Sequence, residues 1–98
     1  MTQFKIFDNP TNEPTREITH GDYDDNAYVA ISISDILENA LRDNPKFQDL
    51  TRKEKDLILF TLRNLSHKLC RIVNGQPLFH DHWIDIKGYT QRLLDNVL

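Results

Sequence analysis

HKLCRIVNGQPLFHDHWIDIKGY, residues 67–89, is the stretch around which the rest of the chain is organised. It contains the end of one predicted helix, a short turn with Gly75 and Pro77, and the start of the next helix. It also holds the chain's one Trp, three of its four His and two of its three Gly. Because the turn is short, we expect the two helices to pack side by side as an antiparallel hairpin.

The helix upstream of this turn is the most strongly patterned segment of the chain. Thr51 and Glu54 have the spacing of a capping box, which predicts a helix start. Gly75 predicts its end, so we expect the helix to run from about residue 52 to residue 73. Its apolar stripe consists of Ile58, Leu62, Leu65, Leu69 and Ile72.

Two further helices are predicted, one on each side. Residues 23–42 follow Asp22, which suits an N-cap, and end before Pro45. The last helix starts near Asp81 and continues to the C-terminus. We expect residues 16–26 to form a turn leading into the first helix, and Phe47 to plug the end of the core. The apolar stripes are Ala30, Ile33, Leu37, Ala40 and Leu41 on one helix and Trp83, Ile86, Leu93, Leu94 and Val97 on the other.

These elements predict an all-α fold. Residues 16–98 form a single three-helix domain that buries one core, and residues 1–15 form a partly extended N-terminal arm. The apolar surface is wider than one core needs, because Phe60 lies opposite the stripe of its own helix. We therefore expect another subunit to cover the excess, which makes the chain a homodimer or a larger closed oligomer.

Composition limits the classes of partner and compartment. The net charge of −3, with acidic and basic residues interspersed, argues against binding to long nucleic acids. A single cysteine, Cys70, excludes an intrachain disulfide and favours a reducing compartment. The N-terminus lacks the apolar core of a signal peptide, and no run reaches transmembrane length. We expect a cytoplasmic protein that does not bind membranes.

Polar side chains from all three helices are expected near a covered surface. Because buried polar groups persist only when paired, these groups should meet each other or a ligand. Lys68 and Arg71 would neutralise an anion, while amide and phenol groups would orient a base or sugar. The structural alternative is an ordinary ion pair from Arg71 to Asp85 or Asp81. The candidate ligand-binding residues are Asp22, Asn26, His67, Lys68, Arg71, His82, Asp85 and Tyr89.

Other kinds of site fit the sequence less well. His80 and His82 alternate at a helix start, so they point apart, and no third ligand stands at a usual metal spacing. Cys70 lies beside the core stripe, where a cysteine is usually an inert packing residue. No P-loop or dinucleotide-binding glycine pattern occurs. We therefore predict no metal site, no cofactor and no catalytic residue.

Three motifs carry a resemblance to a known family. T-H-G-D-Y-x-x-N-A at residues 19–27, H-K-L-x-R-I at 67–72 and D-H-W-x-D-I-x-G-Y at 81–89 resemble a family of small phage and prophage proteins. Those proteins are in turn similar to the MazG-type all-α nucleoside triphosphate pyrophosphohydrolases. The resemblance implies an oligomeric helical domain that handles a nucleotide-like molecule in the cytoplasm of a phage-infected bacterium.

Catalysis of the MazG type needs about four carboxylates on facing helices to hold Mg²⁺ against the phosphates. Here Asp35 and Glu38 have a tolerable spacing but lie on the polar face of the first helix, and Asp81 and Asp85 are spaced by four. The middle helix offers basic groups where a second acidic pair is wanted. Our leading hypothesis is therefore a non-enzymatic protein that binds a nucleotide-like anion and sequesters a bacterial immune signal. The alternatives are a Mg²⁺-dependent pyrophosphohydrolase and an interaction module that inhibits a host protein.

Overall fold

The computed structural model describes residues 16–97, so the predicted N-terminal arm at 1–15 lies outside the described residues. Within the described range the chain is helical and contains no strand, which confirms the all-α prediction. None of these helices combines the length and apolarity needed to cross a bilayer. The helices are α1 (Arg16–His20), α2 (Tyr23–Arg42), α3 (Pro45–Gln48), α4 (Arg52–Asn74) and α5 (His80–Val97).

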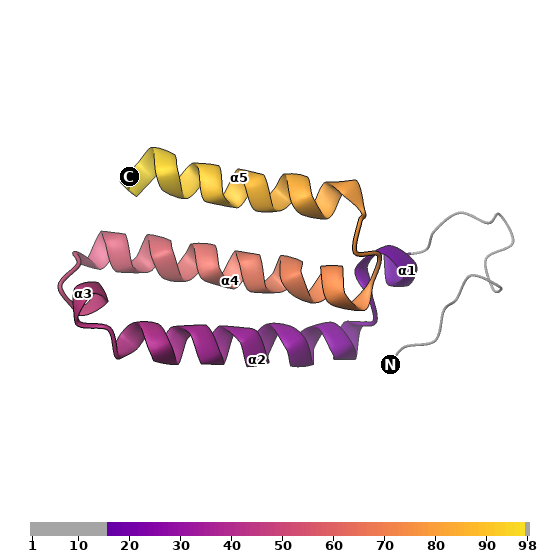
Figure 1. Cartoon of the computed structure of the whole chain (residues 1–98), viewed down its shortest axis with the longest axis horizontal. Helices are drawn as coiled ribbons and strands as arrows, with labels where there is room; N and C mark the ends of the chain where they lie inside the picture. Colours follow the sequence, from indigo (N-terminus) through magenta and orange to yellow (C-terminus); the bar gives the residue numbers. More distant parts are fainter. Residues whose placement is uncertain (1–15, 98) are drawn as a thin grey trace, which may run out of the picture.

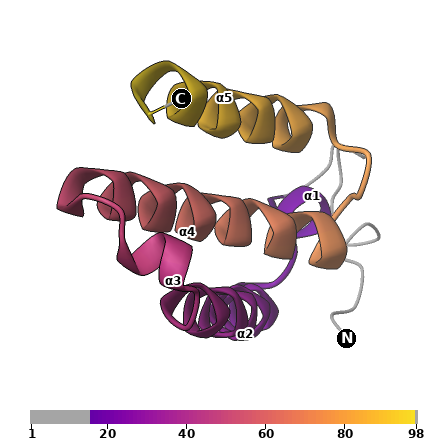
Figure 2. The same ribbon diagram turned by 60° about the vertical axis from the view of Figure 1, so that its left-hand side comes forward.

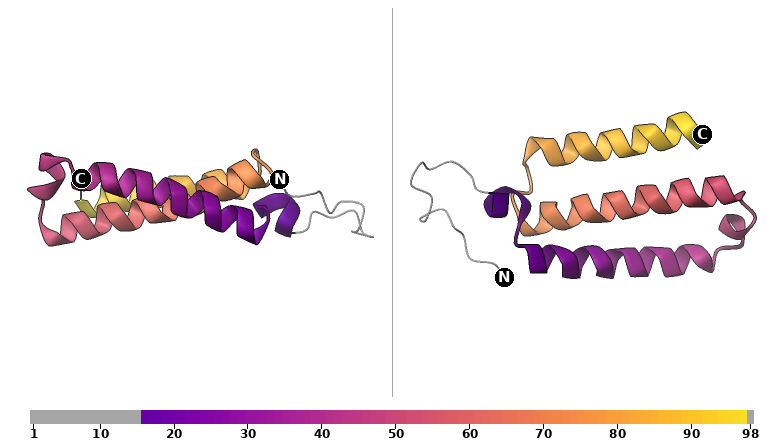
Figure 3. Two further views of the ribbon diagram at one scale, coloured as in Figure 1. Left: turned by 90° about the horizontal axis from the view of Figure 1, so that it is seen from below. Right: turned by 180° about the vertical axis from the view of Figure 1, so that it is seen from behind.

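The three long helices lie in one layer rather than around a common core. α4 occupies the middle, with α2 packed along one side and α5 along the other (Figures 1 and 2). Seen edge-on in the left panel of Figure 3, the helices overlap in a thin band. Among the described residues, the buried apolar side chains are Ala30, Phe47, Cys70 and Ile72.

The helix starts that the sequence predicted are present in the structure. Asp22 caps α2 by accepting a hydrogen bond from the backbone N–H of Asp25 at 3.4 Å. Thr51 and Glu54 form a complete capping box on α4, with bonds of 3.2 and 2.9 Å. The Thr51 backbone N–H that donates to the Glu54 carboxylate favours its ionised form and is the main cause that lowers the pKa of Glu54. Local capping therefore fixes where both helices begin.

Two short helices replace segments that were expected to be irregular. Residues 16–20, predicted as a turn, form α1, which ends at Gly21 with a φ of +85°. A Cβ at Gly21 would stand 2.7 Å from the Cβ of Asn74, so α1 packs tightly against the end of α4. The connector between α2 and α4 contains α3, which holds Phe47 buried as predicted.

Trp83 lies outside the core, which corrects the prediction for the last helix. Its side chain is 47% exposed, and its indole N–H donates to the carbonyl oxygen of Pro77 at 2.7 Å. The adjacent His82 is fully buried instead. The periodicity identified an amphipathic helix correctly. However, the side chains of α5 that contact α1 and α4 are those of His82 and Asp85, and not that of Trp83.

Candidate functional site

A pocket of about 550 Å³ opens between α1, α2 and α4, at the end of the layer where α1 lies. Within the described part of the chain, four basic side chains line it, and Glu17 supplies its one carboxylate. The remaining wall is largely apolar and includes Tyr23, Ala30 and Ile31. The volume is in the range of small-molecule sites in proteins. The basic lining residues are Arg16, His20, His67 and Arg71.

The pocket keeps its shape because α1 is attached to the turn between α4 and α5. The carbonyl oxygen of Thr19 accepts a bond from the backbone N–H of Gln76 at 3.1 Å and lies 2.8 Å from Nε2 of His82. Gly75 packs directly on this carbonyl, since a Cβ there would come within 2.3 Å of the oxygen. The glycine is therefore required by a close backbone approach as well as by the helix end.

Three aromatic rings connect α1 with the start of α5 and the turn before it. His20, Phe79 and His82 contact one another edge to face, with ring centroids 4.8 to 5.5 Å apart. Because a carbonyl can only accept, Nε2 of His82 carries the proton in its bond to Thr19. Among residues 16–97, Nδ1 of His82 is buried without a hydrogen-bond partner. His82 therefore serves to hold α1 rather than to contact a ligand in the pocket.

The pocket carries positive charge that the described residues do not neutralise. Neither Arg71 nor His67 forms an ion pair within residues 16–97, whereas Arg42, Arg52 and Arg63 each have a carboxylate partner. Burial lowers the pKa of His20, and the cationic groups around it lower it further.

Asn26 belongs to the pocket wall and is partly satisfied within the protein. Its amide nitrogen donates to the carbonyl oxygen of His20 at 2.6 Å, and its amide oxygen accepts from the side chain of Asn74 at 3.2 Å. An amide has two N–H groups and two acceptor positions, so one of each is left for a ligand. Asn26 can therefore both position α1 and orient a bound molecule.

Lys68 and Asp85 lie on the other side of α4 and neutralise each other. Nζ of Lys68 stands 2.7 Å from the carboxylate of Asp85, and the lysine side chain is only 5% exposed. This hydrogen bond is the main cause that lowers the pKa of Asp85. The ion pair across α4 and α5 thus uses Lys68, not Arg71 as the structural alternative supposed.

The predicted site residues do not converge on one space. Asn26, His67 and Arg71 meet in the large pocket, while Asp22 caps α2. Tyr89 lines a smaller pocket of about 200 Å³ between α4 and α5. Sequence reasoning missed Arg16, His20 and Tyr23, because residues 16–26 were expected to form a turn. The signal available was the T-H-G-D motif at 19–22, which places a histidine next to a glycine.

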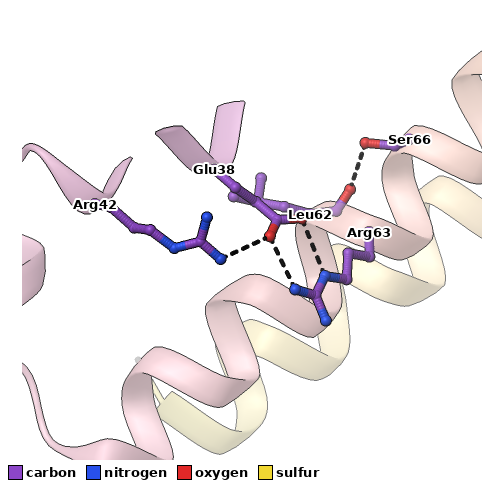
Figure 4. Close-up of polar contacts among 5 residues, drawn as sticks. All are labelled: Glu38, Arg42, Leu62, Arg63 and Ser66. Atoms are coloured by element: carbon purple, nitrogen blue, oxygen red, sulfur yellow. Dashed lines mark hydrogen bonds and ion pairs between the residues drawn. The ribbon is translucent and has the colours of Figure 1, made fainter. Parts of the chain in front are cut away.

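The carboxylates that a MazG-type reaction would use are distributed over both sides of α4. Glu38 is buried rather than on a polar face, and it pairs with Arg63 at 2.8 Å and Arg42 at 3.3 Å (Figure 4). The Arg63 hydrogen bond is the main cause that lowers its pKa. Asp85 lies on α5 and is already paired with Lys68. Residues 16–97 contain no group of three His, Cys, Asp or Glu side chains placed to hold a metal.

The described residues therefore offer a large pocket with four basic side chains, an amide and an apolar wall, a smaller pocket with Arg92, and two carboxylate sites closed by ion pairs. Comparison with known proteins adds no further constraint. No family model, no curated protein and no solved structure matches this chain.

Proposed function

We propose that this chain is a non-catalytic protein that binds a small nucleotide-like anion in the pocket between α1, α2 and α4. The observation that carries the proposal is that Arg71 and His67 line a pocket with an apolar wall and form no ion pair within residues 16–97. Arginine recognises phosphate oxygens through two parallel hydrogen bonds, and its attraction is strong where the site is partly shielded from water.

The other parts of the lining suit the remainder of such a ligand. Tyr23, Ala30 and Ile31 offer apolar and aromatic surface to a planar base. The free donor and acceptor of Asn26 match a base edge or a sugar hydroxyl. The pocket volume of about 550 Å³ accommodates a molecule of nucleotide size.

Binding without turnover is the better reading of this pocket. Burial raises the pKa of the Cys70 thiol, which disfavours the thiolate that a nucleophile would need. Among residues 16–97, Glu17 is the one carboxylate in the lining. A protein that holds a nucleotide without consuming it acts by sequestration. The resemblance of three motifs to phage proteins supports a bacterial immune nucleotide as the sequestered molecule.

Isothermal titration tests the proposal with cyclic dinucleotides, ADP-ribose derivatives and common nucleoside triphosphates. We expect one class to bind, and Arg71→Gln to weaken its binding by about 10- to 100-fold, since a charge-assisted hydrogen bond contributes roughly 1.5–3 kcal/mol. Arg92→Gln is the matched control, because it removes the same charge at the smaller pocket. Failure of all three classes to bind would contradict the proposal.

The same titrations distinguish sequestration from hydrolysis. Under sequestration, the bound nucleotide is recovered intact after long incubation with Mg²⁺. Release of pyrophosphate from a nucleoside triphosphate, abolished by Asp85→Asn, would instead establish the hydrolase alternative.

A further inference from the structure

Contacts of α4 with its neighbours divide its remaining surface into two faces. Arg63 and Asn74 reach toward α2, and Lys68 reaches toward α5 on the other side. At 100° per residue, His67 and Arg71 lie between these directions on the pocket side. Leu65 and Leu69 lie between them on the opposite side. The layer therefore has a pocket face and a second face turned away from it.

The second face is apolar on all three long helices. On α2 it lies opposite the pocket residue Ile31, and on α5 it lies opposite Tyr89 and Arg92, which line the smaller pocket. Over residues 29–40 and 58–73 this arc contains no charged side chain, and over residues 83–97 it contains one, the exposed Lys87 of α5. We call it the apolar face. It consists of Val29, Ile33, Ile36, Leu37 and Ala40, of Ile58, Leu62, Leu65, Leu69 and Val73, and of Trp83, Ile86, Leu94 and Val97.

Several of these side chains are exposed far beyond what a finished core allows. Ile36 is 69% exposed, Val73 56% and Leu94 50%. Many of the apolar residues whose helical periodicity predicted a core therefore lie on this face. A continuous apolar surface of this width marks a contact with another molecule.

We propose that a second copy of this chain covers the apolar face, giving a symmetric dimer of two three-helix layers. On the three helices the apolar face spans 12, 16 and 15 residues. At 1.5 Å per residue and a helix spacing of about 10 Å, it measures roughly 650 Å². Stable interfaces bury about 600–1,000 Å² on each partner, so one copy offers an area at the lower end of that range.

A second copy fits the chemistry of the face for two reasons. Fully buried apolar side chains are few in residues 16–97, so the layer lacks the core that would stabilise it alone. Its cover must therefore be present whenever the chain is folded, as in an obligate homodimer. In addition, a two-fold axis brings the same surface against itself, and a face with only one charged side chain per copy, Lys87 on the outer helix α5, meets its copy with little repulsion.

The first experiment uses the full chain without substitutions. Sedimentation velocity at micromolar concentration should give twice the chain mass of 11.5 kDa. Trp83 is the chain's one tryptophan and lies on the apolar face, so its emission should shift to the red on dilution together with the loss of dimer mass. A monomer at every concentration, or a dimer whose dissociation leaves the Trp83 emission unchanged, would overturn the proposal.

Matched substitutions locate the interface. Leu94 and Ile84 are both on α5 and both 50% exposed, but Ile84 points away from α4, outside the apolar face. Leu94→Lys should raise the concentration of half-dissociation by at least about 100-fold, because symmetry buries two lysines at once. Ile84→Lys should leave it within about threefold. Equal effects of the two substitutions would contradict an interface on this face.

A second pair covers the case in which the first variant loses its fold. Ile36 on the apolar face and Phe60 on the pocket face are 69% and 65% exposed. Loss of helicity in Ile36→Lys but not in Phe60→Lys supports obligate dimerisation, whereas the reverse result overturns it. The pocket lies on the other face, so the binding of nucleotides can fail while the dimer remains, and the two proposals are tested separately.

Discussion

At the scale of single residues, Glu38 shows how tertiary contacts override a local pattern. Its position on the α2 wheel borders the polar side, yet the side chain is buried and shared between Arg63 and Arg42 (Figure 4). A carboxylate can be buried only if its charge is paired and its lone pairs are bonded. Arg63 thus attaches α4 to α2 near the α3 end of the layer.

Glu38→Gln should destabilise the fold, because the two guanidinium groups lose their anionic partner. We expect a loss of about 1 kcal/mol in the free energy of unfolding, small because both arginines are more than half exposed to water. Asp56→Asn is the control, since it breaks the well-exposed Arg52–Asp56 pair and should cost less than about 0.5 kcal/mol. Urea unfolding at pH 7 measures both, and equal losses would contradict a special role for Glu38.

The ion pairs of Glu38 also make the free energy of unfolding depend on pH. The pKa of Glu38 is lower in the folded chain than its ordinary value of 4.5, as is that of Asp85 relative to 3.8. The stabilisation from these two carboxylates is therefore complete at a pH above their pKa values in the unfolded chain. It is lost as the pH falls through their pKa values in the folded chain. Urea midpoints should drop between pH 6 and pH 3, and less so in Glu38→Gln. An identical drop in that variant would show that Glu38 contributes nothing to it.

At the scale of elements, we expect alanine substitutions at two glycines in neighbouring segments to change the free energy of unfolding in opposite directions. Gly75→Ala would place a Cβ within 2.3 Å of the Thr19 carbonyl oxygen and 2.7 Å of that of Arg71, both backbone atoms that cannot move aside. We expect a loss of at least about 2 kcal/mol. Gly88 lies within α5 with no atom within 4 Å of a Cβ, so Gly88→Ala should stabilise by roughly 0.5–1 kcal/mol.

Thermal unfolding at one fixed protein concentration compares these two variants. For a domain of this size, 1 kcal/mol corresponds to about 4–8 °C in Tm. The midpoint should fall in Gly75→Ala and rise in Gly88→Ala. Unchanged stability in Gly75→Ala would mean that α1 is not held against the α4–α5 turn in the way described.

Helix boundaries were predictable from the sequence because capping chemistry is local. Asp22, Thr51 and Gly75 each act within a few residues of their own positions, so they identify the starts of α2 and α4 and the end of α4. The exposure of Trp83 was not predictable in this way. It depends on how α5 is rotated about its axis, and the contacts of His82 and Asp85 with distant segments set that rotation.

The candidate site was predictable only in part for the same reason. Asn26, His67 and Arg71 come from two helices whose periodicity was clear, and the structure brings them together. Lys68 is the neighbour of His67 in sequence, but 100° of rotation turns it from the pocket face toward α5. The spacing of residues in the sequence does not show which of two adjacent basic residues will form an ion pair with a carboxylate on another helix.

At the scale of the whole molecule, a single layer of helices predicts that folding and association are coupled. If the proposed dimer is obligate, Tm should rise by about 4 °C for each tenfold increase in chain concentration. Differential scanning calorimetry over two decades of concentration measures this rise. Leu94→Lys should abolish it, whereas a Tm of the unsubstituted chain that does not depend on concentration would contradict coupled unfolding.

The bond between His82 and the Thr19 carbonyl has a consequence for the order in which the chain folds. It joins residues 63 positions apart, whereas α2 and α4 are joined by a short connector. Because closing a longer loop costs more entropy, we expect α2 and α4 to pair early and α1 to dock late, after α5 has reached α4. The pocket lined by α1 is then completed in the last step, so a bound ligand would select chains that have finished folding.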